Sequence, residues 1–249
     1  MKVTNILTAC GAVLAIAILS VSCKKATGKE VAAEENNFAN KSLVQVFDAT
    51  VNSAATHVFI DGNQATGTAL TYGTVFPASS YAFKVDAGLR SFNIRNTTAG
   101  TTQTPITFAE NMDVNKNYTI FMYDTITSAK QITVPTNIVI PADTTARVRF
   151  ANFIYAPFTP PGIDIFSFLK GANVATNLKV TEVTDFMPYP SRLMDTLYFS
   201  PTGTTNVFLK LVITGTGFIG KRSYTVVYRG SEPRGIYPGT RTASVFTNY

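Results

Sequence analysis

Apolar and polar residues alternate in short runs along most of this chain. In VFLKLVIT (207–214), every second residue from Val207 onward is aliphatic. In LRSFNIR (89–95), Phe92 and Ile94 alternate with polar residues. Alternation of this kind is typical of strands that bury one face. About twelve to fourteen such runs, with no amphipathic helix between them, predict an all-β fold of the sandwich or barrel type.

Glycines separate several of these runs. FIDGNQ (59–64) and TGTGF (214–218) place Gly where a tight turn requires a positive φ angle. We therefore expect neighbouring runs to be joined by short turns.

The first 22 residues have the pattern of a secretory signal peptide. Residues 6–22 carry no charge and lie between one lysine and two others. This stretch is shorter than the roughly 20 residues of a membrane-spanning helix. The small residues Ser20 and Ser22 precede a suitable cleavage site. We therefore predict that residues 1–22 are removed from an exported protein.

Cys23 directly follows this segment and resembles the cysteine of the bacterial lipobox, which is diacylated before signal peptidase II cuts ahead of it. The usual pattern has Leu three residues before the cysteine, where this chain has Ser20, with Leu19 one position further back. LTAC (7–10) is closer to the lipobox in spelling, but most of the apolar run follows Cys10. We therefore predict that Cys23 carries the lipid. The alternative is ordinary cleavage, which would give a soluble exported protein.

Residues 23–41 are predicted to form a lipidated tether, because they show little periodic hydrophobicity. A flexible tether of this length spans about 25 Å. With Cys23 acylated and Cys10 removed, the chain has no cysteine left for a disulfide. Apolar residues make up 45% and charged residues 14% of the chain, a balance that excludes intrinsic disorder. Burial of a core must therefore stabilise the fold.

The net charge of +6 is spread along the chain and does not form a clear basic patch. We expect the densest group to lie on solvated or edge strands, where charge discourages edge pairing. No recognition motif accompanies the charge, so nucleic acid is not an expected partner. The group consists of Lys221, Arg222, Arg229, Arg234 and Arg241.

Two blocks of the chain resemble each other. KNYTIFMYD (116–124) recurs as RSYTVVYRG (222–230), which places Tyr118 on Tyr224. Three further pairs match in the same order at nearly the same offset: LVQVFDA (43–49) with RVRFANF (147–153), HVFID (57–61) with DIFSF (164–168), and YAFKVDAGLRSFNI (81–94) with FMPYPSRLMDTLYF (186–199). Ordered matches favour duplication. We therefore predict two tandem immunoglobulin-like β-sandwich domains, at 42–142 and 143–249.

The same segments resemble the bacterial domain of unknown function 4397. ARVRFANFIYAPFTPPGIDIF (146–166) and SLVQVFDATVNSAATHVFIDG (42–62) are similar to its opening strand, small-residue loop and Asp-flanked second strand. LTYGTVFPASSYAFKVDAGLRSFNI (70–94) is similar to its middle. His57 stands where the family often has Asp, and the second block lacks the Asp-Gly and Ala-Gly turns. The resemblance implies β-sandwich domains in exported or envelope proteins, some labelled as adhesins, and no established chemistry.

Candidate catalytic and metal-binding residues are sparse. His57 is the only histidine, and a zinc site around it would need carboxylates for every other ligand, so we interpret it as a structural residue. Ser167 begins an S-x-x-K spelling, but it follows a strand pattern and the SDN and KTG motifs are missing. Asp61-Gly62-Asn63 offers oxygen ligands but is far shorter than a calcium loop, and a turn is the simpler interpretation. We expect no cofactor and no metal.

Two pairs of carboxylates lie close in sequence, Glu182 with Asp185 and Glu110 with Asp113. A glycosidase needs two carboxylates about 5 to 9 Å apart in one cleft, one of them with a raised pKa. Proximity in a loop establishes neither, so we interpret these residues as solvated loop positions.

Three aromatic residues occupy loops rich in Pro and Gly: Tyr155 and Phe158 in FIYAPFTPPG, and Tyr237 in GIYPGTR. Loops at the end of a sandwich often bind ligands, and an exposed ring can stack on a sugar or anchor a partner. The alternative is that these rings fold back to close the end of a sandwich or an interface.

Together these patterns predict a non-enzymatic lipoprotein of the cell envelope, anchored most readily in the outer membrane, that binds a glycan or protein ligand at the cell surface. A carbohydrate-active enzyme would instead show a polar cleft with paired carboxylates. A passive envelope spacer would show no clustered exposed aromatic residues.

Overall fold

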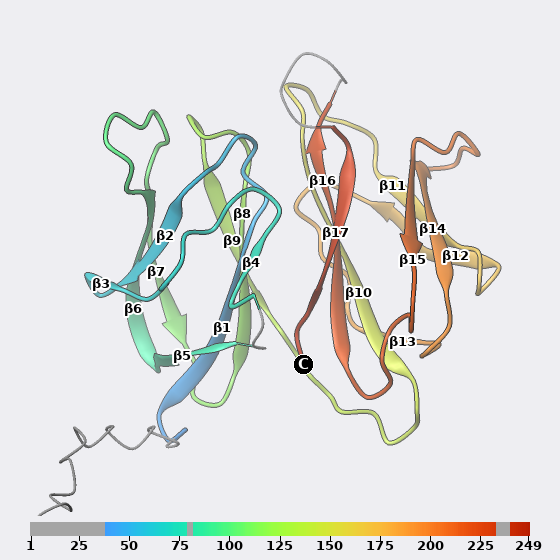
Figure 1. The fold of residues 1–249 in the computed structure, drawn as a ribbon, viewed down its shortest axis with the longest axis horizontal. Helices are drawn as coiled ribbons and strands as arrows, with labels where there is room; N and C mark the ends of the chain where they lie inside the picture. Colours follow the sequence, from blue (N-terminus) through green and yellow to red (C-terminus); the bar gives the residue numbers. More distant parts are fainter. Residues whose placement is uncertain (1–37, 79–81, 233–239) are drawn as a thin grey trace, which may run out of the picture. The chain divides into compact units, whose positions relative to one another are not determined.

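A computed structural model describes residues 38–78, 82–232 and 240–249 (Figure 1). The regular elements in this part of the chain are all strands, which confirms the predicted all-β class. Predictions that concern the signal peptide, Cys23, most of the tether and Tyr237 lie outside the described residues. The described residues include no helix with the length and apolar character needed to cross a membrane.

The described residues form 17 strands, more than the alternation predicts, because β3, β4 and β13 are too short to show a period. The strands are β1 (Lys41–Asp48), β2 (Thr56–Ile60), β3 (Asn63–Gln64), β4 (Val75–Phe76), β5 (Phe83–Asp86), β6 (Gly88–Asn96), β7 (Ile106–Met112), β8 (Asn117–Tyr123), β9 (Lys130–Pro135), β10 (Ala146–Tyr155), β11 (Ile163–Ser167), β12 (Ala172–Leu178), β13 (Met187–Tyr189), β14 (Asp195–Pro201), β15 (Leu209–Ile213), β16 (Ser223–Ser231) and β17 (Thr242–Thr247).

Strands β1–β9, here called the first half, form two sheets. Sheet 1 has the order β4-β1-β8-β9, with β5 also paired to β1, and sheet 2 has the order β3-β2-β6-β7. The turn between β2 and β3 has Asp61 at φ 49° and Gly62 at φ 84°. Two positive φ angles are what a two-residue hairpin turn requires, which explains the Asp-Gly pair at this place.

Strands β10–β17, the second half, repeat this arrangement. Sheet 3 has the order β13-β10-β16-β17, and sheet 4 has the order β12-β11-β14-β15. In each half the first strand runs parallel to the strand that carries the matched tyrosine: Val44 is opposite Tyr118, and Val148 is opposite Tyr224. The strands that the sequence matches align therefore occupy corresponding places in the two pairs of sheets.

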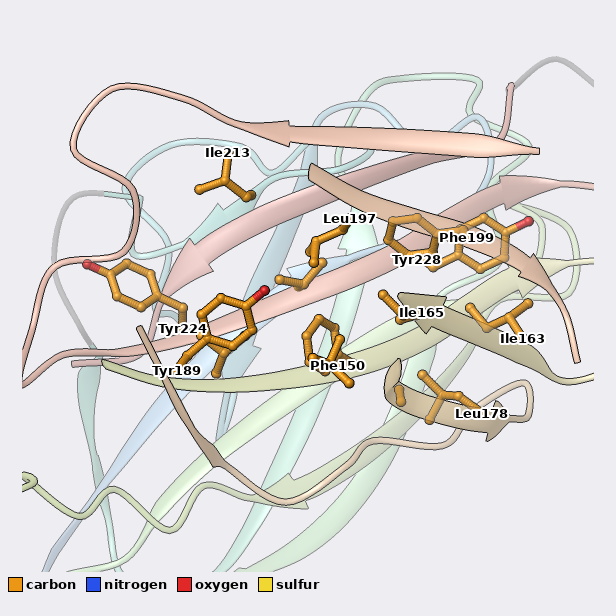
Figure 2. Packing of buried hydrophobic residues seen from close by; sticks show 14 of the residues in the cluster. Phe150, Ile163, Ile165, Leu178, Tyr189, Leu197, Phe199, Ile213, Tyr224 and Tyr228 are labelled. Carbon is orange, nitrogen blue, oxygen red and sulfur yellow. The ribbon is translucent and has the colours of Figure 1, made fainter. Parts of the chain in front are cut away.

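Each half buries its own apolar core between its two sheets. In the first half the core includes Val44, Ile120, Phe92 and Ile94, so the residues predicted from the alternation in 89–95 do face inward. The second core is built in the same way from sheets 3 and 4, and Figure 2 shows its side chains converging between the strands. It includes Phe150, Ile165, Leu197, Phe199, Tyr224 and Tyr228.

A third apolar cluster joins sheet 1 to sheet 3. It contains Phe47, Ala49 and Phe121 from the first half, with Ala151, Phe153, Val227 and Phe246 from the second. The rings of Phe121 and Phe153 stack with centroids 4.5 Å apart, and those of Phe47 and Phe246 lie 5.3 Å apart. These residues alternate with those that face the two cores. The inner strands of sheets 1 and 3, which are β1, β8, β10 and β16, are therefore buried on both faces.

Polar contacts accompany this cluster. The amide of Gln45 donates to the carbonyl of Thr247 at 2.9 Å and accepts from Asn248 at 2.7 Å. The guanidinium of Arg149, which is only 2% exposed, donates to the hydroxyls of Thr119 in the first half and Thr225 in the second. Its burial lowers its pKa to about 9. The two halves are thus held by directional bonds as well as by ring packing.

The strand order does not confirm the immunoglobulin likeness predicted from the sequence. In a constant-type immunoglobulin sandwich the first two strands share a sheet. Here β1 and β2 lie in different sheets, and so do β10 and β11. The reason is that alternation identifies which residues face a core but not which strands become neighbours.

The expectation that the late basic group lies on solvated or edge strands is wrong for Arg229. This residue lies on β16, an inner strand of sheet 3. Its guanidinium lies 4.3 Å from the ring centre of Tyr72 in the first half and donates to the hydroxyl of Ser244 at 2.8 Å. Arg229 is therefore a contact between the halves. Arg234, of the same group, lies outside the described residues.

Candidate functional site

The loop at 156–162 connects β10 to β11 and carries Phe158, one of the predicted aromatic residues. Tyr155 is the last residue of β10, opposite Ser231 of β16. The segment then contains Pro160 and Pro161. Proline has no backbone N–H and cannot donate to a strand partner, so the chain leaves the sheet here. As a result, Phe158 projects from the end of sheet 3 with 53% of its surface exposed.

A cavity of about 650 Å³ lies beside this loop and draws residues from both halves. This volume is within the range of small-ligand sites. Tyr123, the last residue of β8, lines it from the first half, and its ring lies 5.7 Å from that of Phe153. Tyr155 and Phe158 line it from the second half. The walls are completed by Asp124, Lys130, Ile154, Ala156, Thr159, Pro160, Pro161, Gly162, Lys179 and Val180.

Two lysines and one carboxylate supply the charged groups of the cavity. Lys130 donates to Asp124 at 2.7 Å, and this hydrogen bond raises the pKa of the lysine. The other oxygen of Asp124 accepts the N–H of Thr125 at 2.8 Å. Lys179 is exposed, and its backbone N–H donates to Glu182 at 2.8 Å. The cavity therefore combines aromatic walls with a mainly cationic edge.

The structure brings together two of the three predicted aromatic residues. Tyr155 is half-buried at the cavity wall and Phe158 is exposed, so Phe158 does not fold back to close the sandwich. Tyr237 is outside the described residues. Sequence reasoning missed Tyr123, Asp124 and Lys130, because nothing in their local pattern indicates that the end of β8 lies next to the end of β10.

A second cavity, of about 330 Å³, lies on the other side of the same loop. Phe158, Pro160 and Pro161 line both cavities. Its polar wall is a buried group in which Tyr228 donates to Glu232 at 3.1 Å and Glu232 pairs with Arg241. Burial, followed by the charge of Glu232, raises the pKa of Tyr228. The polar groups of this wall are therefore paired with one another.

A smaller cavity of about 220 Å³ is lined by two carboxylates, Asp61 and Asp86. Asp61 accepts hydrogen bonds from the backbone of Ser91 and from Arg90, which lower its pKa, and Lys41 lowers that of Asp86 in the same way. A glycosidase acid needs a raised pKa. These two carboxylates therefore fit surface ion pairs better than acid catalysis.

The remaining sequence candidates have structural partners. His57 is half-buried on β2, with one ring nitrogen 3.2 Å from the hydroxyl of Thr66. Ser167 is fully buried at the end of β11, and its hydroxyl donates to Asp195 at 2.5 Å. No group of three His, Cys, Asp or Glu residues with metal-binding geometry occurs in the described part of the chain.

The carboxylates that lie close in sequence, Glu182 with Asp185 and Glu110 with Asp113, do not form catalytic pairs in the structure. Glu182 binds the backbone N–H of Lys179, and Asp113 accepts from the amide of Asn111 at 2.9 Å. Asp185 lines a cavity of about 360 Å³ beside Arg147 and Arg149. The pairs do not define a shared cleft.

No family model and no curated protein sequence matches this chain. Among solved structures, the chain is similar to a family CBM26 module of Amy13K from Eubacterium rectale, crystallised in complex with maltoheptaose. The identity is 10% and the TM-score 0.25, over 84% of this chain and 97% of that one. It is also similar to a "putative cell adhesion protein" from Bacteroides uniformis, with 10% identity and a TM-score of 0.25, over 84% of this chain and 100% of that one.

Proposed function

We propose that this chain is a non-enzymatic binding or adhesion module of the bacterial cell envelope, and that it holds a glycan or protein ligand in the cavity between β8 and β10. The observation that carries the proposal is the convergence of Tyr123, Tyr155 and Phe158 on a single cavity. Aromatic rings supply large contact area at low conformational cost and are enriched at binding sites.

The polar groups of the cavity fit this role. Lys130 and Lys179 lie at its edge and can donate to hydroxyl, carbonyl or carboxylate groups of a ligand. Asp124 is already paired with Lys130 and is the only carboxylate among the residues described as lining this cavity. The site lacks the two facing carboxylates that glycoside hydrolysis uses, so binding without turnover is the function it supports best.

The architecture that we propose for the whole chain is a signal peptide, a lipidated tether and two tandem β-sandwich domains that arose by duplication, as in the bacterial domain of unknown function 4397. Matching strand pairs in sheets 1 and 3 and in sheets 2 and 4 support the duplication. The lipid on Cys23 would hold the protein in the outer membrane.

The ligand site is tested by adhesion of cells that display the full chain, on a glycan array and on immobilised extracellular proteins. Replacing the rings in the variants Tyr155→Ala and Phe158→Ala is expected to weaken adhesion about tenfold each, since each removes aromatic contact area. Phe38→Ala is the matched control, because Phe38 is 49% exposed and does not line the cavity. Unchanged adhesion of both cavity variants would rule out this site.

The anchor is tested separately. The variant Cys23→Ala removes the thiol that we expect to be acylated, so the protein should move from the membrane fraction to the soluble fraction. Detergent extraction followed by immunoblotting measures this shift. Cys10→Ala is the control and should leave the distribution unchanged, and persistent membrane association of Cys23→Ala would refute the anchor.

A further inference from the structure

A row of four side chains crosses the outer face of sheet 4, away from the core. The strand pairings place Asn173 beside Phe166, Phe166 beside Tyr198, and Tyr198 beside Lys210. Ile165 and Leu197, which directly precede Phe166 and Tyr198 on their strands, face the core and are fully buried. The row therefore runs from β12 through β11 and β14 to β15 on the surface.

Aromatic side chains are unexpected on this face. An antiparallel sheet with one buried face normally presents polar residues on the other. Phe166 is 36% exposed, and its ring centroid lies 6.4 Å from that of Tyr198. The ammonium of Lys210 lies 5.4 Å from the centre of the Tyr198 ring. The two rings and the lysine thus form a platform on the surface.

A cavity of about 420 Å³ runs along this platform. Phe166 and Tyr198 line it, and most of its other lining side chains have hydroxyl or amide groups: Asn173, Ser200, Thr204 and Thr205. It is thus an aromatic floor with hydrogen-bonding groups along its side.

Asp164 holds the loop after β14 against this face. One carboxylate oxygen accepts the N–H of Asn177 at 2.8 Å, and the other accepts the N–H of Gly203 at 3.0 Å. Gly203 directly precedes the two threonines of the cavity. Because Asp164 is only 7% exposed, these bonds are sheltered and keep the loop in place.

The first half shows that the fold does not require this platform. The corresponding row in sheet 2 consists of Gln64, Phe59, Asn93 and Thr107, joined by the same strand pairings. Asn93 takes the place of Tyr198. In addition, the guanidinium of Arg95 lies over the ring of Phe59 at 4.4 Å. One half therefore presents a single ring covered by an arginine, whereas the other presents two neighbouring rings, of which Phe166 is 36% exposed.

We infer that the outer face of sheet 4 binds an oligosaccharide. The C–H faces of pyranose rings stack on exposed aromatic rings, and sugar hydroxyls exchange hydrogen bonds with amide and hydroxyl side chains. A protein partner would favour a larger patch without hydrogen-bonding side chains at its centre, whereas this cavity of about 420 Å³ sets four hydroxyl or amide side chains beside its two rings. This site does not include the cavity between β8 and β10.

The test is isothermal titration of the purified full chain in detergent with cellohexaose, maltohexaose and hexagalacturonic acid. Binding of at least one of these is expected. Tyr198→Asn, which copies the residue of the first half, and Phe166→Ser should each weaken that binding about tenfold or more. Both side chains reach the surface, and thermal melting of each variant checks that the fold is retained.

Phe59→Ser is the matched control at the corresponding position of sheet 2 and should leave the affinity unchanged. Phe166 and Tyr198 do not line the cavity of the proposed function, so loss of binding in their variants is assigned to the outer face of sheet 4. Failure of all three oligosaccharides to bind at millimolar concentration would overturn the inference. So would binding that survives Tyr198→Asn, or self-association of the chain, measured by sedimentation, that this substitution abolishes.

Discussion

At the scale of single residues, Asp48 has the most unusual environment among the described carboxylates. It is completely buried at the end of β1, where it accepts the hydroxyl of Ser53 at 2.5 Å and the N–H of Thr50 at 2.9 Å. Burial raises its pKa from 3.8 to about 6, against the lowering effect of these bonds and of Arg229. The fold is therefore more stable when the carboxyl group of Asp48 is protonated and neutral.

The variant Asp48→Asn tests this. Because the pKa of Asp48 is higher in the folded than in the unfolded chain, its contribution to stability is fully present below pH 3.8. This contribution is lost as the pH rises through about 6, where the buried carboxyl group ionises. The asparagine should therefore match the wild type near pH 4 and exceed its free energy of unfolding by up to about 3 kcal/mol at pH 7. Urea denaturation between pH 4 and pH 7 measures the difference.

Asp86→Asn is the control with the opposite sign. Lys41 lowers the pKa of Asp86, so this exposed pair stabilises the fold at pH 7 and loses its effect as the pH falls. A difference between Asp48→Asn and wild type that stays constant over the whole range would contradict the assignment.

At the scale of elements, the matched tyrosines make the same contact in each half. The hydroxyl of Tyr118 accepts the N–H of Asp113 at 3.2 Å, and that of Tyr224 accepts the N–H of Ile219 at 3.1 Å. In both cases the donor lies five residues earlier, in the loop that leads into the parallel strand. Each tyrosine thus holds the loop that precedes its strand, which explains why both blocks have a tyrosine at this position.

The variants Tyr118→Phe and Tyr224→Phe are each expected to lower the free energy of unfolding by about 1 to 2 kcal/mol, because a sheltered N–H loses its acceptor. Chemical denaturation measures both. Tyr198→Phe, with its ring on the solvent side of sheet 4, should change stability by less than about 0.5 kcal/mol. A large effect in only one of the matched pair would argue against an equivalent role.

At the scale of the whole molecule, the apolar cluster between sheets 1 and 3 couples the two halves. Phe153 is almost fully buried there and stacks on Phe121. Arg149 and Gln45 add hydrogen bonds across the same contact. Each half thus stabilises the other, and we expect the described part of the chain to unfold in a single transition.

The variant Phe153→Ala is expected to cost about 3 to 5 kcal/mol and to separate the unfolding of the halves into two transitions. Differential scanning calorimetry distinguishes one transition from two. Leu89→Ala is the control, because Leu89 is 70% exposed, and it should leave the profile unchanged. A single transition at the wild-type temperature in Phe153→Ala would show that the cluster does not couple the halves.

The candidate site could be predicted only in part. Tyr155 and Phe158 were accessible to sequence reasoning, since prolines mark their loop as the end of a strand. Tyr123 and Lys130 were not, because the parallel pairing of each half and the contact between halves bring distant strand ends together. Phe166 and Tyr198 were hidden for a similar reason: alternation alone does not distinguish a ring on an outer face from a ring in a core.

The amino-acid sequence by itself determined the all-β class, the inward positions of strands such as 89–95, and the order of the matched segments, because these follow from local alternation and turn chemistry. Only the tertiary structure decided which strands became neighbours. It also decided that inner strands of sheets 1 and 3 are buried on both faces, and that the guanidinium of Arg149 is removed from solvent. Those outcomes depend on contacts between residues far apart in the chain, and no local pattern encodes them.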